Sequence, residues 1–363
     1  MHKAVNQLEI QEFSSWSPSI NKKVIIAGPC SAESEKQLLN TAEALAGSID
    51  IFRAGIWKSR TQAKTFTGIG KSGLKYLKKI EELFNIPVMI EVLTPEHAAL
   101  ALQYDIKYVW LGARTTVNPY LVSEIAQALA GSEVGVFIKN PIIPDLPMWI
   151  GAIERINSVG ITKIAAIHRG FQSMFSAPYR NEPIWEISIK LKCMFPSLPI
   201  ICDPSHIAGN TKYISEISKK SISLDMAGLM IETHINPQAA LSDKEQQLNP
   251  SELKILIDTL YLPSENSPHI KTEDKSETLK QIENLRQLIN SLDESMLKTI
   301  SQRFNAVKEI GALKKELNIP ALQVSRWNEL MQNRISIGND LSLSEEFVEK
   351  LMEIIHYEAL KQQ

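Results

Sequence analysis

The sequence predicts an α/β protein, with a closed barrel of eight parallel strands followed by a small all-helical domain that dimerises. Three observations predict this fold. Eight short apolar runs recur in the first 235 residues with helical patterns between them, an alternation that indicates parallel βαβ units. Each run leads into polar or charged residues, and chemistry on a (β/α)8 (TIM) barrel is built at its strand ends. After a linker at residues 263–276 the pattern becomes wholly helical.

The apolar runs are near-continuous, as expected for strands buried on both faces of a sheet. In chain order they are Lys23–Pro29, Ile51–Phe52, Val88–Ile90, Tyr108–Leu111, Val134–Ile138, Ile161–Ile167, Leu198–Ile201 and Gly228–Ile231. Helical patterns fill the gaps at Glu35–Ala46, Gly73–Phe84, Pro95–Gln103, Tyr120–Leu129, Pro147–Asn157, Pro183–Phe195, Lys212–Ser221 and Pro250–Leu262. The alternative is an open doubly wound sheet, which does not need polar residues at all eight strand ends.

Composition limits the class of protein. The 363 residues are enough for a barrel and a small second domain. A net charge of −2 gives no indication of binding to nucleic acid or to a membrane surface. No apolar run approaches the ~18 residues of a membrane span, and the N-terminus lacks a signal-peptide core. Three cysteines argue against a disulfide framework. We therefore expect a cytoplasmic protein.

A change of composition separates the two expected domains, 1–262 and 277–363. Residues 263–276 contain two prolines, serines and mixed charges, which is typical of a linker. Apolar spacings of three and four over Thr278–Leu317 predict one amphipathic helix of ~60 Å. Shorter helices are expected at Ser325–Ser336 and Ser344–Gln363. So long a helix cannot bury its apolar stripe within one small domain, which favours a homodimer.

Polar residues at the predicted barrel rim indicate a metal and an anionic substrate. The candidate metal ligands are Cys30, His206, Glu232 and Asp243. Any one of them alone is explained more simply as structural, but four such donors at one rim favour a divalent transition metal. The cations at the strand ends are Arg53, Lys58, Arg60, Arg114, Lys139, Arg169 and Arg180. Their clustering in a chain of balanced charge predicts a positive basin for phosphates and carboxylates.

The segments at these positions resemble 3-deoxy-arabino-heptulosonate-7-phosphate (DAHP) synthases, more narrowly those with compact barrels. They are GPCS (28–31), FRAGIWKSRT (52–61), EV (91–92), GARTT (112–116), IKNP (138–141), HRGF (168–171), DPSH (203–206) and IETH (231–234). The resemblance covers the first domain, in the family's order. That family condenses phosphoenolpyruvate with erythrose 4-phosphate and releases phosphate, the first step of the shikimate pathway of aromatic amino acid biosynthesis.

The resemblance implies roles for individual residues. The metal, expected to be Mn²⁺ with Fe²⁺, Co²⁺ or Zn²⁺ as alternatives, would be held by Cys30, His206, Glu232 and Asp243. Phosphoenolpyruvate would bind Arg53, Lys58, Glu91, Arg114, Lys139 and Arg169, and the sugar phosphate would bind Arg60, Thr61 and Asp203. Lys58, Lys139, Cys30 and His206 are the expected catalytic residues. The metal would polarise the aldehyde, and either Lys139 or a metal-bound water would carry protons.

One residue departs from the family pattern, and one relative competes with it. Ser59 stands where the family usually has a proline, which would loosen the loop of Arg60 without removing a functional group. The competing relative, 3-deoxy-octulosonate-8-phosphate synthase, uses arabinose 5-phosphate. The Arg60–Thr61 pair and the DPSH segment favour the four-carbon sugar.

Basic residues in the tail predict a second site. Arg303 and Lys314 are three helical turns apart and share a face, whereas Arg286 points about 100° away and would reach the pocket of a dimer partner. The tail resembles all-helical chorismate mutases in LRQLINSLDE (285–294), SQRFNAVKEIGALKKE (301–316), SRW (325–327) and IIHYEALKQQ (354–363). By that resemblance, chorismate would be bound by Arg286 of the other protomer, Arg303, Lys314, Gln323, Arg326 and Gln363, with Lys314 and Gln363 acting on the ether oxygen.

The rearrangement of chorismate to prephenate needs no acid, base or nucleophile, so positioned cations suffice. Trp327 and Ala359 replace a glutamate and a serine often found in the family, which would lower activity. The alternatives are a sensor of chorismate or prephenate that regulates the barrel, and a dimerisation module without a ligand. Lys314 and Gln363 favour catalysis, so we expect a bifunctional enzyme. Allosteric inhibition of the barrel by prephenate is a further hypothesis.

Overall fold

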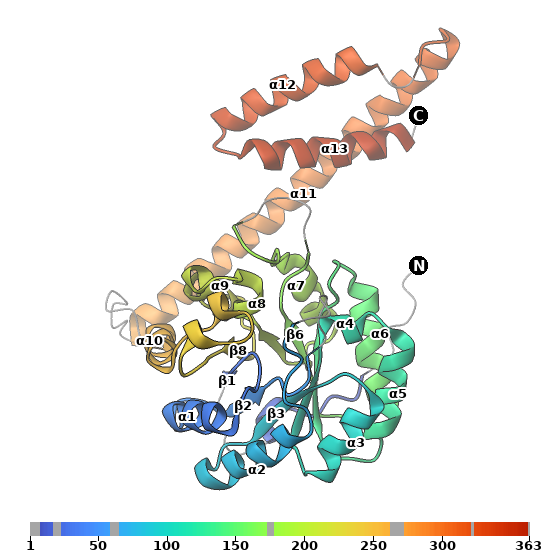
Figure 1. The fold of residues 1–363 in the computed structure, drawn as a ribbon. Coiled ribbons are helices and arrows are strands. Elements are labelled where there is room, and N and C mark those ends of the chain that lie inside the picture. Colours follow the sequence, from blue (N-terminus) through green and yellow to red (C-terminus); the bar gives the residue numbers. More distant parts are fainter. Residues whose placement is uncertain are drawn as a thin grey trace. The chain divides into compact units, whose positions relative to one another are not determined.

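A closed barrel of eight parallel strands forms the first part of the computed structural model (Figure 1). The structure describes residues 8–16, 23–58, 65–172, 178–261, 272–320 and 323–361, and divides into two compact units, Met1–Leu262 and Pro263–Gln363. The strands are joined in sequence order, and β1 pairs with β8 to close the barrel. The closure confirms the predicted barrel and excludes the open sheet.

Several barrel strands include a charged residue at or next to their last position. They are β1 (Val24–Gly28), β2 (Ile51–Ala54), β3 (Val88–Val92), β4 (Tyr108–Leu111), β5 (Gly135–Lys139), β6 (Ile164–His168), β7 (Ile200–Cys202) and β8 (Gly228–Glu232). Arg53, Glu91, Lys139 and Glu232 are therefore strand residues, although the apolar pattern predicted strands that end before them. The ladder continues because it uses only backbone groups, and the charged side chains lie at the mouth of the barrel.

Helices cover the outside of the barrel (Figure 1). They are α1 (Glu35–Leu45), α2 (Ser72–Phe84), α3 (Pro95–Gln103), α4 (Ala113–Thr116), α5 (Pro119–Leu129), α6 (Leu146–Asn157), α7 (Trp185–Met194), α8 (Pro204–Ala208), α9 (Ile214–Ser223) and α10 (Pro250–Tyr261). The short helices α4 and α8 escaped the sequence pattern because one turn carries no periodicity. In α8 the Asp203 side chain caps the helix by accepting a hydrogen bond from the backbone N–H of His206 (3.0 Å).

Two apolar clusters hold the barrel. One lies between the strands and the surrounding helices, and the other fills the barrel interior. The interior cluster is closed at the N-terminal end by Phe13 and Trp16, whose rings pack against Tyr108 and Phe137. The bottom of the barrel is therefore plugged, and the open face is the one where the strands end.

The second unit contains three helices: α11 (Thr272–Glu316), α12 (Val324–Asp340) and α13 (Glu345–Lys361). Helix α11 begins before the predicted Thr278, so residues 272–276 of the predicted linker are helical. No proline or glycine lies between residues 269 and 310 to stop the helix earlier. The rest of the predicted linker, 263–271, lies outside the described residues. Helices α12 and α13 pack closely, because a Cβ on Gly338 would come 2.4 Å from Val348 Cγ2.

An apolar stripe on α11 is exposed in the single chain. Leu285, Ile289, Leu292 and Met296 are each more than half exposed. None of the helices in the described part of the chain is long and apolar enough to cross a membrane.

Gly28 is a position where barrel closure tolerates no side chain. Its φ is +149°, and a Cβ there would come 2.1 Å from the backbone oxygen of Arg53. We expect Gly28→Ala to cost about 3 kcal/mol or more, because strain and a backbone clash coincide. Gly131→Ala is the matched control: its φ is +73° but the space is open, so strain of about 1–2 kcal/mol is all it should cost. Urea unfolding followed by tryptophan fluorescence measures both, and equal losses would contradict the prediction.

Asp225 ties the start of β8 to β1 and α7, and its effect should depend on pH. Its carboxylate lies 2.6 Å from Lys23 Nζ and 2.9 Å from Lys192 Nζ, and these hydrogen bonds lower its pKa from 3.8 to about 2. A lowered pKa stabilises the fold above the ordinary value, and the contribution is lost as pH falls towards 2. Asp225→Asn should therefore cost at most about 1 kcal/mol at pH 7. The difference from wild type in urea unfolding should shrink below pH 4; a constant difference would disprove the assignment.

Candidate active site

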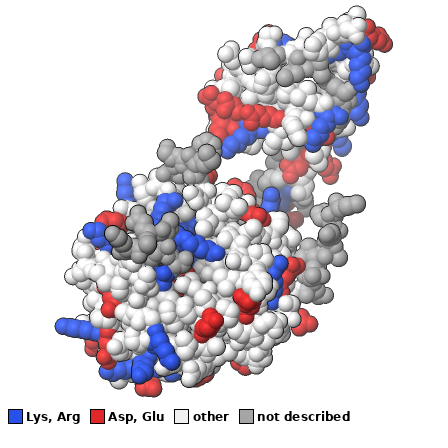
Figure 2. All heavy atoms as spheres, turned by 45° about the vertical axis from the view of Figure 1, so that its right-hand side comes forward, with Lys and Arg blue, Asp and Glu red and all other residues white. Residues whose placement is uncertain are grey.

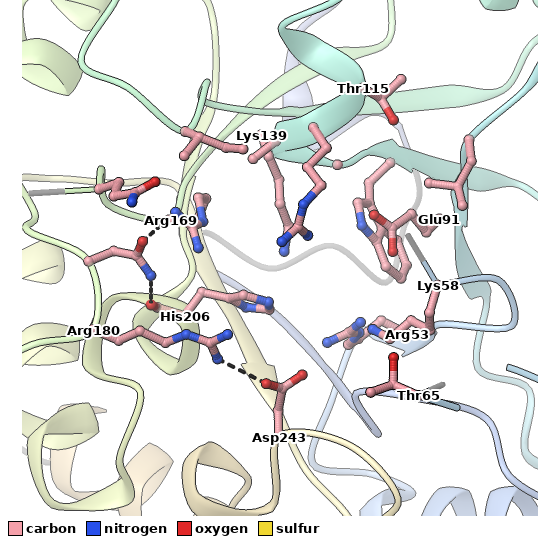
Figure 3. Close-up of a pocket in the computed structure, with 18 residues that line it drawn as sticks. Arg53, Lys58, Thr65, Glu91, Thr115, Lys139, Arg169, Arg180, His206 and Asp243 are labelled. Atoms are coloured by element: carbon pink, nitrogen blue, oxygen red, sulfur yellow. Dashed lines mark hydrogen bonds and ion pairs between the residues drawn. The ribbon is translucent and has the colours of Figure 1, made fainter. Parts of the chain in front are cut away.

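A cavity of about 550 Å³ opens where the barrel strands end (Figure 3). Nine of the residues predicted from the sequence line it together: Arg53, Lys58, Glu91, Arg114, Lys139, Arg169, Arg180, His206 and Asp243. Cys30, Asp203 and Glu232 are fully buried and contact these lining residues. Arg60 and Thr61 lie outside the described residues. The barrel thus brings together residues that are up to 213 positions apart in sequence.

Two buried ion pairs lie in the site. Arg53 Nη1 is 2.8 Å from Glu232 Oε1, with side chains 1% and 0% exposed. Lys139 Nζ is 2.7 Å from Asp203 Oδ2. Burial opposes ionisation of Glu232, but His206, Arg53 and Lys58 outweigh it and lower the pKa of this carboxyl. The Arg53 guanidinium also lies 4.7 Å from the centre of the Trp110 ring, which lines the cavity.

The Asp203 carboxylate contacts the imidazole of His206. Its Oδ2 lies 2.8 Å from His206 Nδ1 as well as against Lys139. Although burial opposes it, the charges of His206 and Lys139 hold the pKa of Asp203 well below its usual range. The carboxylate therefore lies against the Nδ1 side of the imidazole, and Nε2 is 3.8 Å from Glu232 Oε1.

Lys58 and Glu91 fit against glycines. A Cβ on Gly55 would come 2.9 Å from Lys58 Nζ, and a Cβ on Gly112 would come 2.2 Å from Glu91 Oε1. Burial opposes the charge on Lys58, but Cys30, Glu91 and Glu232 raise its pKa. The two glycines therefore leave room for a lysine and a glutamate on this side of the cavity.

The four candidate metal donors lie in two close pairs. The Cys30 thiol donates to Asp243 Oδ2 over 3.2 Å, and His206 lies near Glu232. Burial, with Glu232 adding, raises the pKa of Cys30 to about 12. Within the described part of the chain, no three or more histidine, cysteine or acidic side chains form a preformed metal cluster. The donors are adjacent but still engaged with one another and with cations.

Two amide residues of the site were given no role in the sequence analysis: Asn140, which lies in the IKNP segment, and Asn181, which lies in no quoted segment. Asn140 accepts a hydrogen bond from the backbone N–H of Arg169 (2.7 Å). Asn181 accepts one from Arg169 Nη1 (2.8 Å) and donates to the backbone oxygen of His206 (2.7 Å). Burial lowers the pKa of Arg169 to about 10. The amide side chains therefore fix the position of this arginine.

Basic and acidic side chains are interspersed over the barrel surface drawn in Figure 2. The cavity differs, since Arg53, Lys58, Arg114, Lys139 and Arg169 all line it. The acids Glu91 and Asp243 also line it, and Glu232 and Asp203 are buried beside it, but with Arg180 the lysines and arginines outnumber these acids. The excess of positive charge suits an anionic ligand.

A second cationic cluster lies in the helical unit. Burial and Arg334 on α12 lower the pKa of Arg303, and Arg303 Nη1 is a buried atom without a hydrogen-bond partner. Burial, Arg303 and Lys314 likewise lower the pKa of His356 on α13. Its ring stacks on Trp327 with centres 4.0 Å apart. Arg334 and His356 were not predicted, because three helices must pack to bring them to Arg303.

Other residues predicted for the tail are not gathered there. Arg286 and Arg326 are exposed and lie 3.6 and 2.9 Å from Glu283 and Glu329 of their own helices. Gln323 is also exposed. Gln363 lies outside the described residues.

Comparison with known proteins identifies both parts. Residues 19–261 match the DAHP synthetase I family, and residues 285–363 match chorismate mutase type II. A phospho-2-dehydro-3-deoxyheptonate aldolase of Thermotoga maritima is 32% identical over 236 residues, which are 64% of this chain and 67% of that protein. A 2-dehydro-3-deoxyphosphooctonate aldolase of Wolinella succinogenes is 26% identical over 268 residues, 67% of this chain and 99% of its own.

Solved structures agree with the sequence matches. The crystal structure of phospho-2-dehydro-3-deoxyheptonate aldolase (DAHP synthase) from Thermotoga maritima superposes with a TM-score of 0.60 and 28% identity, and the match covers 66% of this chain and 68% of that one. A truncated form of the Thermotoga 3-deoxy-D-arabino-heptulosonate 7-phosphate synthase gives 0.58 and 27%, over 66% and 85%. The chain therefore belongs to the DAHP synthetase I family and is a bifunctional enzyme, in which a chorismate mutase type II region follows the synthase barrel.

Proposed function

We propose that the barrel condenses phosphoenolpyruvate with erythrose 4-phosphate to give DAHP and phosphate. The observation that carries this proposal is the wall of cations in the cavity, formed by Arg53, Lys58, Arg114, Lys139 and Arg169. Phosphoenolpyruvate has a phosphate and a carboxylate, and guanidinium groups bind both with paired hydrogen bonds. The new bond joins C3 of phosphoenolpyruvate to the aldehyde carbon of the sugar. Water adds at C2, which becomes a ketone as the bond to the phosphate breaks; one proton of the water passes to the former aldehyde oxygen and the other leaves with the phosphate.

Two groups in the cavity suit anion binding and proton transfer. Arg169, held by Asn140 and Asn181, presents a fixed guanidinium to an anion. Lys139 lies between Asp203 and the cavity, so it is placed to hold or move a proton at a substrate oxygen. Fixed cations around the reacting atoms stabilise the charge that develops there and cost no reorganisation.

The family is generally dependent on a divalent metal, and the donor set fits one. Two ligands at 2.0–2.3 Å from one ion lie about 3–4 Å apart, which agrees with 3.2 Å between Cys30 and Asp243 and 3.8 Å between His206 and Glu232. These four residues would hold the ion, with Mn²⁺ the first expectation. When bound, a divalent ion supplies Lewis-acid polarisation of the aldehyde. It would also favour the Cys30 thiolate, which burial disfavours.

The identity of the sugar rests on a smaller observation. Relatives named 2-dehydro-3-deoxyphosphooctonate aldolase are 24–26% identical to this chain, below the 32% of the Thermotoga protein. Arg60 and Thr61, which favour erythrose 4-phosphate in the sequence, lie outside the described residues. Rates with erythrose 4-phosphate and arabinose 5-phosphate, measured side by side, test this choice directly.

We further propose that the helical unit rearranges chorismate to prephenate. Arg303 and Arg334 repel one another, and Arg303 Nη1 is buried without a partner, so a dianionic ligand would offset both. Lys314 and His356 lie close enough to interact with this cluster. A unimolecular reaction needs only that the reactive conformer be held and its charge stabilised. A regulatory role for prephenate is compatible with the same site.

A homodimer through α11 completes this proposal. The exposed stripe of Leu285, Ile289, Leu292 and Met296 needs an apolar partner, and a second copy of α11 supplies one. Arg286 follows Leu285 directly, so a dimer would place it beside the other protomer. Sedimentation of the full chain distinguishes a dimer from a monomer.

Replacing the proposed thiolate ligand tests the metal site. Cys30→Ala should weaken Mn²⁺ binding at least about tenfold, because one of four donors is lost. Cys202→Ala is the matched control, since Cys202 is equally buried but packs in the apolar cluster outside the barrel interior. Isothermal titration of the full chain with Mn²⁺ measures both. Equal affinity in wild type and Cys30→Ala would remove Cys30 from the ligand set.

Replacing Arg303 separates the two activities. Arg303→Ala should lower kcat/KM for chorismate at least about 100-fold, because a buried charged hydrogen bond in the transition state is lost. Synthase activity of the same protein should be unchanged. Lys308→Ala, an exposed change on the same helix, is the control. If the wild-type chain binds chorismate without converting it, the tail is a sensor; full mutase activity in Arg303→Ala would place the site elsewhere.

A further inference from the structure

We propose that Arg180 and Gln246 are positioning residues that orient the two carboxylates of the metal site. They hold one oxygen each of Asp243 and Glu232, so that the remaining oxygens face Cys30 and His206. Arg180 was predicted only as one of the cations around the barrel mouth, and Gln246 was not predicted; neither is assigned a step in the synthase reaction proposed above. The inference rests on the metal-dependent synthase function proposed above.

Arg180 fixes Asp243. Its Nη1 atom donates to Asp243 Oδ1 over 2.9 Å, and Asp243 Oδ2 is the oxygen that lies 3.2 Å from Cys30 Sγ. Figure 3 shows the Arg180 side chain reaching across the cavity edge to this carboxylate. The two oxygens therefore have separate partners, which sets the rotation of the carboxylate and turns Oδ2 towards the thiol.

Gln246 repeats this arrangement at Glu232. Its Nε2 donates to Glu232 Oε2 (2.7 Å), and its Oε1 accepts from the same Arg180 Nη1 (2.8 Å). Glu232 Oε1 is left facing His206 Nε2 at 3.8 Å, beside Arg53. Gln246 is 1% exposed, and an amide so deeply buried needs both of its hydrogen bonds. Arg180 Nη1 thus binds the Asp243 carboxylate directly and is connected to the Glu232 carboxylate through the Gln246 amide.

The backbone holds both residues in place. The N–H groups of Arg180 and Asn181 donate to the backbone oxygens of Ala208 and Ile207 in α8, the helix that contains His206. The Gln246 N–H donates to the oxygen of Asp243, and Gln247 accepts from the N–H of Cys30. The loops after β6 and β8 are therefore both tied to segments that supply candidate ligands.

Arg180 could instead bind substrate, and that role predicts a different effect of its replacement. Its side chain is 51% exposed and lines the cavity, so direct binding of a substrate phosphate is the competing explanation. Loss of a phosphate contact would raise KM for a substrate and leave metal affinity unchanged. Loss of a positioning contact would weaken metal binding in the absence of any substrate, because outer partners orient the ligands.

The test measures Mn²⁺ affinity by isothermal titration of the full chain without substrates. We expect Arg180→Gln and Gln246→Leu each to weaken binding about 10–100-fold. The double variant should lose less than the product of the two factors, because both act through one chain of hydrogen bonds. Arg180→Lys, which keeps one charged donor, should recover part of the loss. Arg155→Gln, on α6 away from the cavity, should match wild type.

The second readout is the affinity of the metal-free protein for phosphoenolpyruvate, measured by tryptophan fluorescence. In Arg180→Gln this affinity should change less than about twofold. Thermal midpoints exclude a general loss of structure. If both Arg180→Gln and Gln246→Leu bind Mn²⁺ within about twofold of wild type, the positioning role is wrong while the proposed metal site stands. If Arg180→Gln has a raised KM for a substrate but intact metal affinity, Arg180 is a substrate-binding residue. A wild-type chain that binds no divalent ion would overturn the proposed metal site as well.

Discussion

Charged side chains at the ends of the barrel strands are buried, and buried charge has to be paired. Arg53 and Glu232 are the clearest case, with 1% and 0% of their side chains exposed and 2.8 Å between them. Removing one partner of such a pair typically costs about 3–5 kcal/mol. The pair joins β2 to β8, the two neighbours of β1. Gly28 on β1 has no side chain, so the backbone of Arg53 can approach it closely.

The same pairing prepares the barrel for anions and a cation. Glu232 and Asp203 neutralise Arg53 and Lys139, while Arg114 and Arg169 add positive charge at the cavity wall. Glu232 and Asp243 are also the oxygen donors of the candidate metal set. In the proposed reaction, charge balance would link two binding events: an anionic substrate would pair with the cations, and a divalent ion would bind at the carboxylates that now neutralise or face them.

The helical unit has a smaller charged cluster than the barrel, and its residues come from helices rather than strand ends. Its cluster of Arg303, Arg334, Lys314 and His356 comes from three helices. Burial and the charges of Arg303 and Lys314 lower the pKa of His356, so the cluster disfavours a further positive charge on this ring. A rearrangement that exchanges no proton needs fixed charge and shape more than acid–base chemistry. The exposed apolar stripe lies on α11, the helix that also carries Arg303. The geometry of a site built on such a long helix depends on what covers the remaining faces of that helix.

The sequence by itself determined the barrel, because eight buried parallel strands alternate with helices and each ends in polar residues. It also identified Arg53, Lys139 and His206 as cavity residues, since residue type and strand position are both local. It did not predict the contacts of Asn181, Gln246 or Arg334. Amides and helix-surface arginines have no periodic signal, and their partners are distant in sequence. The tertiary structure alone decided which oxygen of each carboxylate faces which donor, because that depends on how separate loops dock.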